Sequence, residues 1–67
     1  MKDRKLAEIY AQLAKLFEVR ATVQETIDAR EDAGKEKYDA MGIRLMIAKA
    51  DLTRKIDDLH SEILKNL

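Results

Sequence analysis

Large apolar residues recur along the first half of the chain at steps of three, four and seven residues. They are Leu6, Ile9, Leu13, Leu16, Val23 and Ile27. This spacing places them along one side of an α-helix, because a strand would show strict alternation instead. Tyr10, Phe17 and Val19 lie on the flanks and widen the stripe beyond a bare coiled-coil contact line. The pattern predicts a helix over about residues 3–32, with Asp3 as its N-cap.

A second apolar stripe follows, with steps of only three and four residues. Its members are Tyr38, Met41, Leu45, Ala48, Leu52, Ile56, Leu59 and Ile63. The mean step is about 3.6 residues, which is the pitch of a nearly straight helix. We therefore predict a second helix over about residues 35–65.

Between the stripes, residues 28–37 contain no large apolar side chain and have Gly34 near their centre. Glycine adopts the left-handed conformation that ends many helices. We predict a turn at about residues 33–35, with Glu36 in the first turn of the second helix. The fold is then an all-α antiparallel helical hairpin forming one domain, 1–67. One unbroken helix is the alternative, because there is no proline and a glycine costs only about 1 kcal/mol within a helix.

Folding the chain back at this turn brings the two stripes into register. Leu16 then faces Leu52, and the pairs on either side follow the same order. Arg20, the one charged residue in the first stripe, faces the small Ala48. We predict that its guanidinium passes over Ala48 toward Asp51, with the aliphatic stem buried and the charged head in water.

The second predicted helix is apolar on more sides than one partner helix can cover. Exposing this surplus would forgo several kcal/mol, at about 25 cal/mol per Å² of apolar area. We predict a partner interface formed by Met41, Ile43, Met46, Ile47 and Ala50. The expected partner is the chain itself, as a homodimer or higher oligomer that forms an antiparallel four-helix bundle. The small residues Gly42, Ala48 and Ala50 would let another helix approach closely.

The composition of the chain further reduces the classes of partner to be expected. The 67 residues carry 13 basic and 13 acidic side chains and no cysteine, so disulfides are excluded and oligomerisation is the remaining way to stabilise so small a domain. The segment to Gly34 has 6 basic and 7 acidic residues and the remainder has 7 and 6, so there is no basic patch and nucleic acid is not an expected partner. No apolar run is long enough for a membrane span, and residues 1–5 do not resemble a signal peptide. We expect a cytoplasmic protein that binds no membrane.

Candidates for chemistry are few. His60 has the neighbours Asp57, Asp58 and Glu62 but no second histidine, so we expect a surface histidine and not a metal ligand. The chain contains no nucleophile motif, phosphate-binding loop or cofactor fingerprint. We expect no enzyme, no catalytic residue, no cofactor and no metal site.

The sequence therefore predicts a small structural or regulatory protein–protein interaction module that acts as a homo-oligomeric helical bundle. In length, hairpin architecture and the order of Gly34 and Tyr38 at the second helix, the chain resembles the small co-chaperones of type III secretion needle subunits. In length and architecture it also resembles the plasmid RNA-binding dimers of the Rop type. These resemblances imply two alternatives, a chaperone-like adaptor that binds a partner's amphipathic helix and a small RNA- or DNA-binding dimer.

Overall fold

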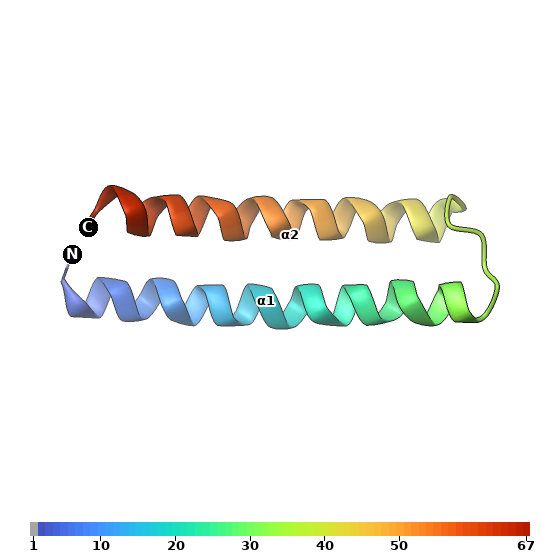
Figure 1. The fold of residues 1–67 in the computed structure, drawn as a ribbon, viewed down its shortest axis with the longest axis horizontal. Helices are drawn as coiled ribbons and strands as arrows, with labels where there is room; N and C mark the ends of the chain where they lie inside the picture. Colours follow the sequence, from blue (N-terminus) through green and yellow to red (C-terminus); the bar gives the residue numbers. More distant parts are fainter. Residues whose placement is uncertain (1) are drawn as a thin grey trace.

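The protein folds into two long helices that lie side by side in opposite directions (Figure 1). The computed structural model describes residues 2–67, with α1 at Asp3–Asp32 and α2 at Ala40–Lys65. The hairpin measures 48 × 15 × 12 Å, and both ends of the chain lie at the end opposite the connection. Residues 2–67 contain no strand. The predicted all-α helical hairpin is confirmed at the level of a single chain.

The first helix has the predicted bounds, and Gly34 ends it as predicted. Gly34 has a φ of 73°, in the left-handed region that glycine tolerates. Its N–H donates to the Glu31 carbonyl at 3.0 Å, and the Lys35 N–H donates to the Arg30 carbonyl at 2.9 Å. These two bonds form the Schellman motif, which satisfies carbonyls that the helix end leaves unpaired.

The N-cap prediction for α1 is wrong. The capping position is Lys2, whose side chain makes no capping hydrogen bond. Asp3 is the first helical residue, so its carboxylate lies in the first turn near the positive end of the helix dipole. The residue type was informative about the helix start, but its position differs by one residue.

The second helix begins at Ala40, five residues later than predicted, so the connection spans residues 33–39 and includes Glu36. Asp39 is the N-cap, and its Oδ1 accepts a hydrogen bond from the Gly42 N–H at 2.7 Å. Tyr38 therefore precedes the helix and is 69% exposed. Its spacing from Met41 matched the stripe, but this spacing alone does not distinguish the first helical turn from the residues before it.

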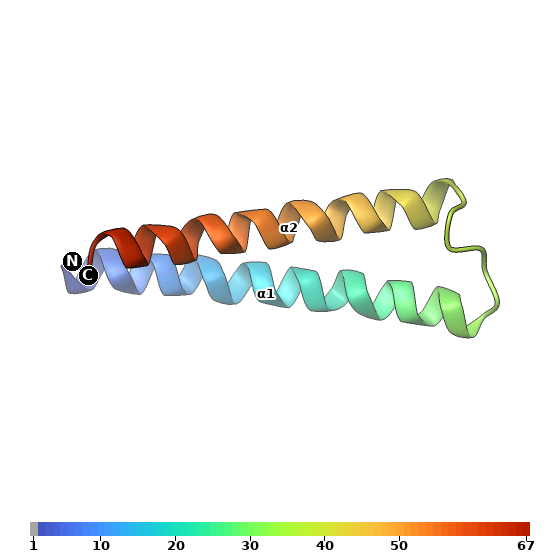
Figure 2. The ribbon, with the colours of Figure 1, turned by 45° about the horizontal axis from the view of Figure 1, so that its top comes forward.

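The hydrophobic core lies at the end of the hairpin that carries the chain termini. Ile9, Leu13 and Ile56 are only 1%, 4% and 2% exposed. The partly buried side chains packed against them are Leu16, Leu59 and Ile63. In the view of Figure 2 the two helices overlap at this end and diverge toward the connection. We divide the hairpin at the middle of α1 and use "terminal half" for residues 2–17 and 51–67 and "turn half" for residues 18–50.

Candidate partner-binding surface

All five residues of the predicted interface are exposed in the single chain. Among the four large side chains of this predicted interface, Ile47 is the most exposed, at 58%, and Met46 is the least exposed, at 39%. Ala50 is also exposed. The apolar surplus on α2 is therefore present on the surface of the hairpin. Partner binding by these residues stays a prediction.

A groove of about 680 Å³ opens along one side of the hairpin, mostly in the turn half, and its lining reaches Thr53, Arg54 and Asp57 in the terminal half. Its apolar lining comes from Ile27 on α1 and from Leu45, Met46 and Ala50 on α2. The predicted interface is therefore divided: Met46 and Ala50 line the groove, whereas Met41, Ile43 and Ile47 do not. We call the side of the molecule on which the groove opens the groove face.

Charged side chains surround this apolar lining. The basic ones are Arg30, Lys35, Lys37, Lys49 and Arg54, and the acidic ones are Glu31, Glu36 and Asp57. Two of the basic side chains pair within the chain, Arg30 with Asp39 and Arg54 with Asp51. An apolar centre with a charged border is the usual composition of a surface that contacts another protein.

Asp39 fixes the connection at the turn end of the groove. Arg30 Nη2 lies 2.6 Å from both carboxylate oxygens of Asp39, and the Gly42 N–H donates to Oδ1. The Gly42 hydrogen bond, followed by the Arg30 hydrogen bond and the charges of Arg30 and Lys35, holds the pKa of Asp39 below its ordinary value of 3.8. The sequence did contain a signal for this role, since aspartate is a preferred N-cap residue.

The space beside the Cα atom of Gly42 is filled by the chain's own connection and not by a second helix. It is buried, and a Cβ added to it would lie 2.1 Å from the carbonyl oxygen of Lys37. Real Cβ atoms do not approach backbone so closely, so the connection uses the space that a side chain would fill. The prediction that Gly42 allows a partner helix to approach is therefore wrong.

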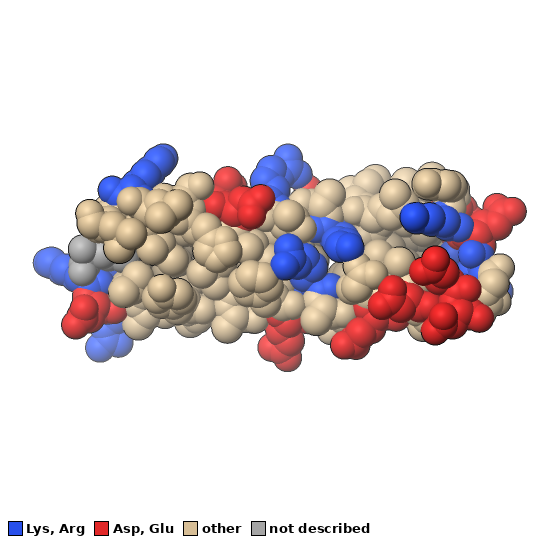
Figure 3. Space-filling model, viewed as in Figure 1, with Lys and Arg blue, Asp and Glu red and all other residues tan. Residues whose placement is uncertain are grey.

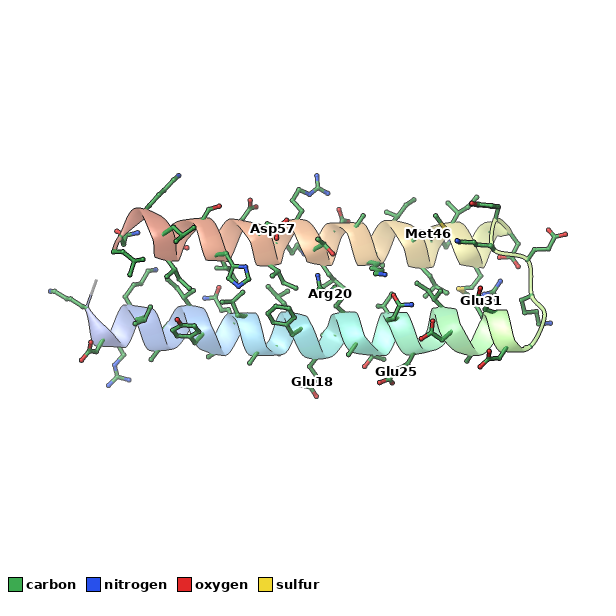
Figure 4. The ribbon with its side chains drawn as sticks, viewed as in Figure 1. Glu18, Arg20, Glu25, Glu31, Met46 and Asp57 are labelled. Atoms are coloured by element: carbon green, nitrogen blue, oxygen red, sulfur yellow. The ribbon has the colours of Figure 1, made fainter. Side chains whose placement is uncertain are left out.

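Arg20 crosses from α1 to α2, but its partner differs from the predicted one. Its Nη1 donates to the hydroxyl of Thr53 at 3.1 Å, while Asp51 pairs with Arg54 on its own helix. The guanidinium also lies over the Phe17 ring, 5.0 Å from its centroid, which is within cation–π range. Figure 4 shows Arg20 pointing toward α2, whereas Glu18 and Glu25 on the same helix point away from it.

His60 is exposed, as predicted for a surface histidine. Its ring lies beside the Phe17 ring, with the centroids 6.3 Å apart and the planes tilted by 47°. In the part of the chain that the structure describes, no three His, Cys, Asp or Glu side chains are grouped so that they could hold a metal ion.

The groove face continues from the turn half onto the terminal half. On α1, Tyr10 and Phe17 precede the groove residues Gln24 and Glu31 at a regular spacing of seven residues, which keeps all four on nearly the same side of the helix. On α2, Leu64 follows the groove residue Asp57 by the same interval. The three residues that extend the face, Tyr10, Phe17 and Leu64, are exposed large apolar side chains.

The two halves of the groove face also differ in surface character. Figure 3 shows mostly uncharged surface over the terminal half and acidic side chains gathered over α1 near the connection. The exposed acidic residues of that segment are Glu25, Asp28, Glu31 and Asp32. One half of the face thus offers exposed apolar side chains, and the other offers a groove with a charged border.

A second, smaller groove of about 460 Å³ lies on the opposite flank of the apolar stripe. It is lined by Leu16, Val19 and Leu59 together with Gln12, Lys15, Lys55 and Asp58. Val19 follows Phe17 by two residues, a rotation of about 200° around the helix, so the two side chains lie on different flanks. This pair offers a matched comparison between the two sides of the molecule.

Comparisons with protein families, with curated proteins and with solved structures give no match to this chain. Neither α1 nor α2 is both long enough and apolar enough to cross a lipid bilayer, judged over residues 2–67.

Proposed function

We propose that this chain is a small structural or regulatory interaction module that self-associates into a helical bundle, with a homodimer forming an antiparallel four-helix bundle as its simplest form. The observation that carries the proposal is the contrast between a compact core in the terminal half and exposed apolar side chains around a groove in the turn half. Packing a second pair of helices on this surface would remove it from water.

The energetic argument concerns the size of the domain. Among residues 2–67 the buried apolar side chains are Ile9, Leu13 and Ile56, and they form a core that is small for an independent fold. Large apolar residues are also exposed on both helices, among them Phe17, Ile43 and Ile47. Because each fully buried large apolar side chain contributes about 1.5–3 kcal/mol, covering several of them is comparable to the whole stability of a small domain.

The adaptor alternative has one observation in its favour. The apolar lining of the groove includes Ile27, Leu45 and Met46, and charged residues also line it. An amphipathic helix of another protein would place its apolar side in such a groove, and the flexible thioether of methionine adapts to different partners. Under this alternative the purified chain is a monomer with an accessible apolar groove.

Sedimentation equilibrium at several protein concentrations, with thermal melting of the same samples, tests the proposal. We expect a mass above 7.7 kDa that approaches a multiple of it, and a melting temperature that rises with concentration because folding and association are linked. A monomer whose melting temperature does not depend on concentration would overturn self-association and favour the adaptor.

A further inference from the structure

We infer that the groove face binds a second copy of this chain turned end for end, so that the terminal half of each copy covers the groove of the other. This inference rests on the proposed self-association and adds to it the face that is used and the direction of the second copy. Three observations support it: the position of the groove, the position of the exposed apolar side chains, and the distribution of charge along the helices.

The apolar features of the groove face are complementary when one copy is reversed. Most of the groove lies in the turn half and it ends at Asp57, whereas exposed Tyr10 and Leu64 lie beyond it in the terminal half. A twofold axis through the middle of the face places Tyr10 and Leu64 of the first copy over the groove of the second. It also places Tyr10 and Leu64 of the second copy over the groove of the first, as in a symmetric dimer interface. A second copy in the same direction would place groove over groove and leave a void where protein interfaces are normally close-packed.

The positions of these residues along the helix axis agree with the end-for-end arrangement. The midpoint of α1 lies between Phe17 and Glu18. With the twofold axis at this point, Phe17 lies near the axis and Tyr10 comes to the level of residue 25 in the other copy. The α1 residues that line the groove at this level are Gln24 and Ile27. The tyrosine ring of each copy is therefore placed at the groove of the other.

The charges divide into four segments of alternating sign. On the α1 side, residues 2–17 have four basic and two acidic side chains, and residues 18–34 have two basic and five acidic ones. On the α2 side, residues 35–50 have four basic and two acidic side chains, and residues 51–67 have three basic and four acidic ones. The sign changes at the middle of each helix, and neighbouring segments in the hairpin carry opposite net charge.

This pattern favours dimers in which all neighbouring helices are antiparallel. In the end-for-end arrangement α1 lies against α1 and α2 against α2, both antiparallel, so each net positive segment meets a net negative one. Placing α1 parallel to the α2 of the other copy would bring segments of like charge together. Charge of this kind contributes mainly to the choice of partner and orientation. The charges alone also permit a same-direction dimer with antiparallel neighbours, and the position of the groove decides between the two.

The direction can be measured with spin labels, because the chain has no cysteine and each introduced cysteine is unique. We would label Ala29→Cys, an exposed site near the connection, and measure the distance between the two labels of a dimer by pulsed electron paramagnetic resonance. End for end, the two sites are separated by about 35 Å along the bundle, at 1.5 Å per residue from the α1 midpoint. In the same direction only the bundle width separates them, about 20 Å.

Ala14→Cys is the matched control, since this exposed site lies close to the α1 midpoint and gives a short distance in either arrangement. A long Ala29 distance with a short Ala14 distance supports the inference. Short distances at both sites in a protein of dimeric mass would overturn the inference and leave self-association intact. A monomeric mass for the labelled and unlabelled chains would overturn the proposed function itself.

A pair of substitutions tests the face independently of the direction. Phe17 and Val19 are 41% and 42% exposed, so they differ in flank and not in exposure. We expect Phe17→Glu to weaken dimerisation at least tenfold, because it places a carboxylate at the centre of the interface. Val19→Glu should leave the dimer dissociation constant within about twofold. Circular dichroism at high concentration checks helicity, and Phe17→Ser with Val19→Ser is the second pair if a glutamate variant unfolds. Equal effects, or a larger effect at Val19, would overturn the assignment of the face.

Discussion

In the terminal half, α1 and α2 close on each other and exclude water from Ile9, Leu13 and Ile56. In the turn half the same apolar stripe continues through Val23, Ile27 and Leu45, but these side chains are only partly buried. Gly42 alone is buried among residues 18–50, and it is covered by the chain's own connection. A continuous stripe therefore does not guarantee a continuous core in a hairpin of two helices.

The turn half is held by polar contacts instead. Arg30, Asp39 and the Gly42 N–H form one network at the connection, and Arg20 bonds to Thr53 near the middle of the hairpin. These contacts fix the geometry of the helices without filling the space between them. The terminal half holds the core of the single chain, and the turn half leaves a groove that the proposed second copy would cover.

The largest expected difference between the halves comes from two isoleucines on the same helix. Ile9→Ala should lower the free energy of unfolding by about 2–5 kcal/mol, since it removes a fully buried side chain and leaves a cavity. Ile27→Ala should cost less than about half as much in dilute protein, because Ile27 is only partly buried in a single chain. Urea titration at low protein concentration measures both. Equal losses would show that the two halves are equally well packed.

The next largest effect concerns the connection. Gly42→Ala should destabilise the hairpin by about 1–3 kcal/mol, because the new Cβ would overlap the Lys37 carbonyl and force residues 37–39 to move. Helix propensity alone predicts the opposite, a gain of about 1 kcal/mol. Gly34→Ala is the comparison: it meets no neighbouring atom, so its expected loss of about 1–2 kcal/mol comes only from the left-handed backbone. Thermal melting of Gly42→Ala above the wild-type temperature would contradict the close approach.

The smallest effect is the pH dependence of the turn half. Because the pKa of Asp39 is lowered in the folded chain, its ionisation contributes stability that is present above the ordinary value of 3.8 and is lost as the pH falls through the lowered value. The amide resonance of Gly42 should therefore titrate with a midpoint below 3.8. Asp39→Asn keeps a capping oxygen but removes the charge, so this step should disappear. A wild-type midpoint at or above 3.8 would contradict the Arg30–Asp39 network.

The helical stripes were predictable because burial follows the 3.6-residue period directly. The bounds of α1 were correct for this reason. The left-handed Gly34 was predictable for a different reason, because glycine tolerates a positive φ at a helix end. The start of α2 was not, because it depends on the capping bond of Asp39 and on the path of the connection, which periodicity does not contain. The partner of Arg20 was also missed, since opposite charge suggested Asp51, whereas Asp51 has Arg54 one helical turn away.

The candidate surface was predictable only in part. Surplus apolar residues on α2 correctly indicated exposed positions, because two helices cannot enclose every side of one of them. Their division into groove residues, such as Met46, and residues outside the groove, such as Ile47, depends on the separation of the helices in the turn half. The sequence already contains the seven-residue spacing that relates Tyr10 and Phe17 to Gln24. It could not assign Tyr10 and Phe17 to the groove face, because the structure was needed to show that Gln24 lines the groove.

Hydrogen exchange across a range of protein concentrations tests most directly whether a second copy completes the turn half. If it does, amide protection over residues 40–50 rises with concentration as dimers form, and it rises more than protection over residues 56–63, which already border the core of the single chain. Protection over residues 40–50 that stays the same while the protein passes from monomer to its highest measurable concentration would contradict the proposal.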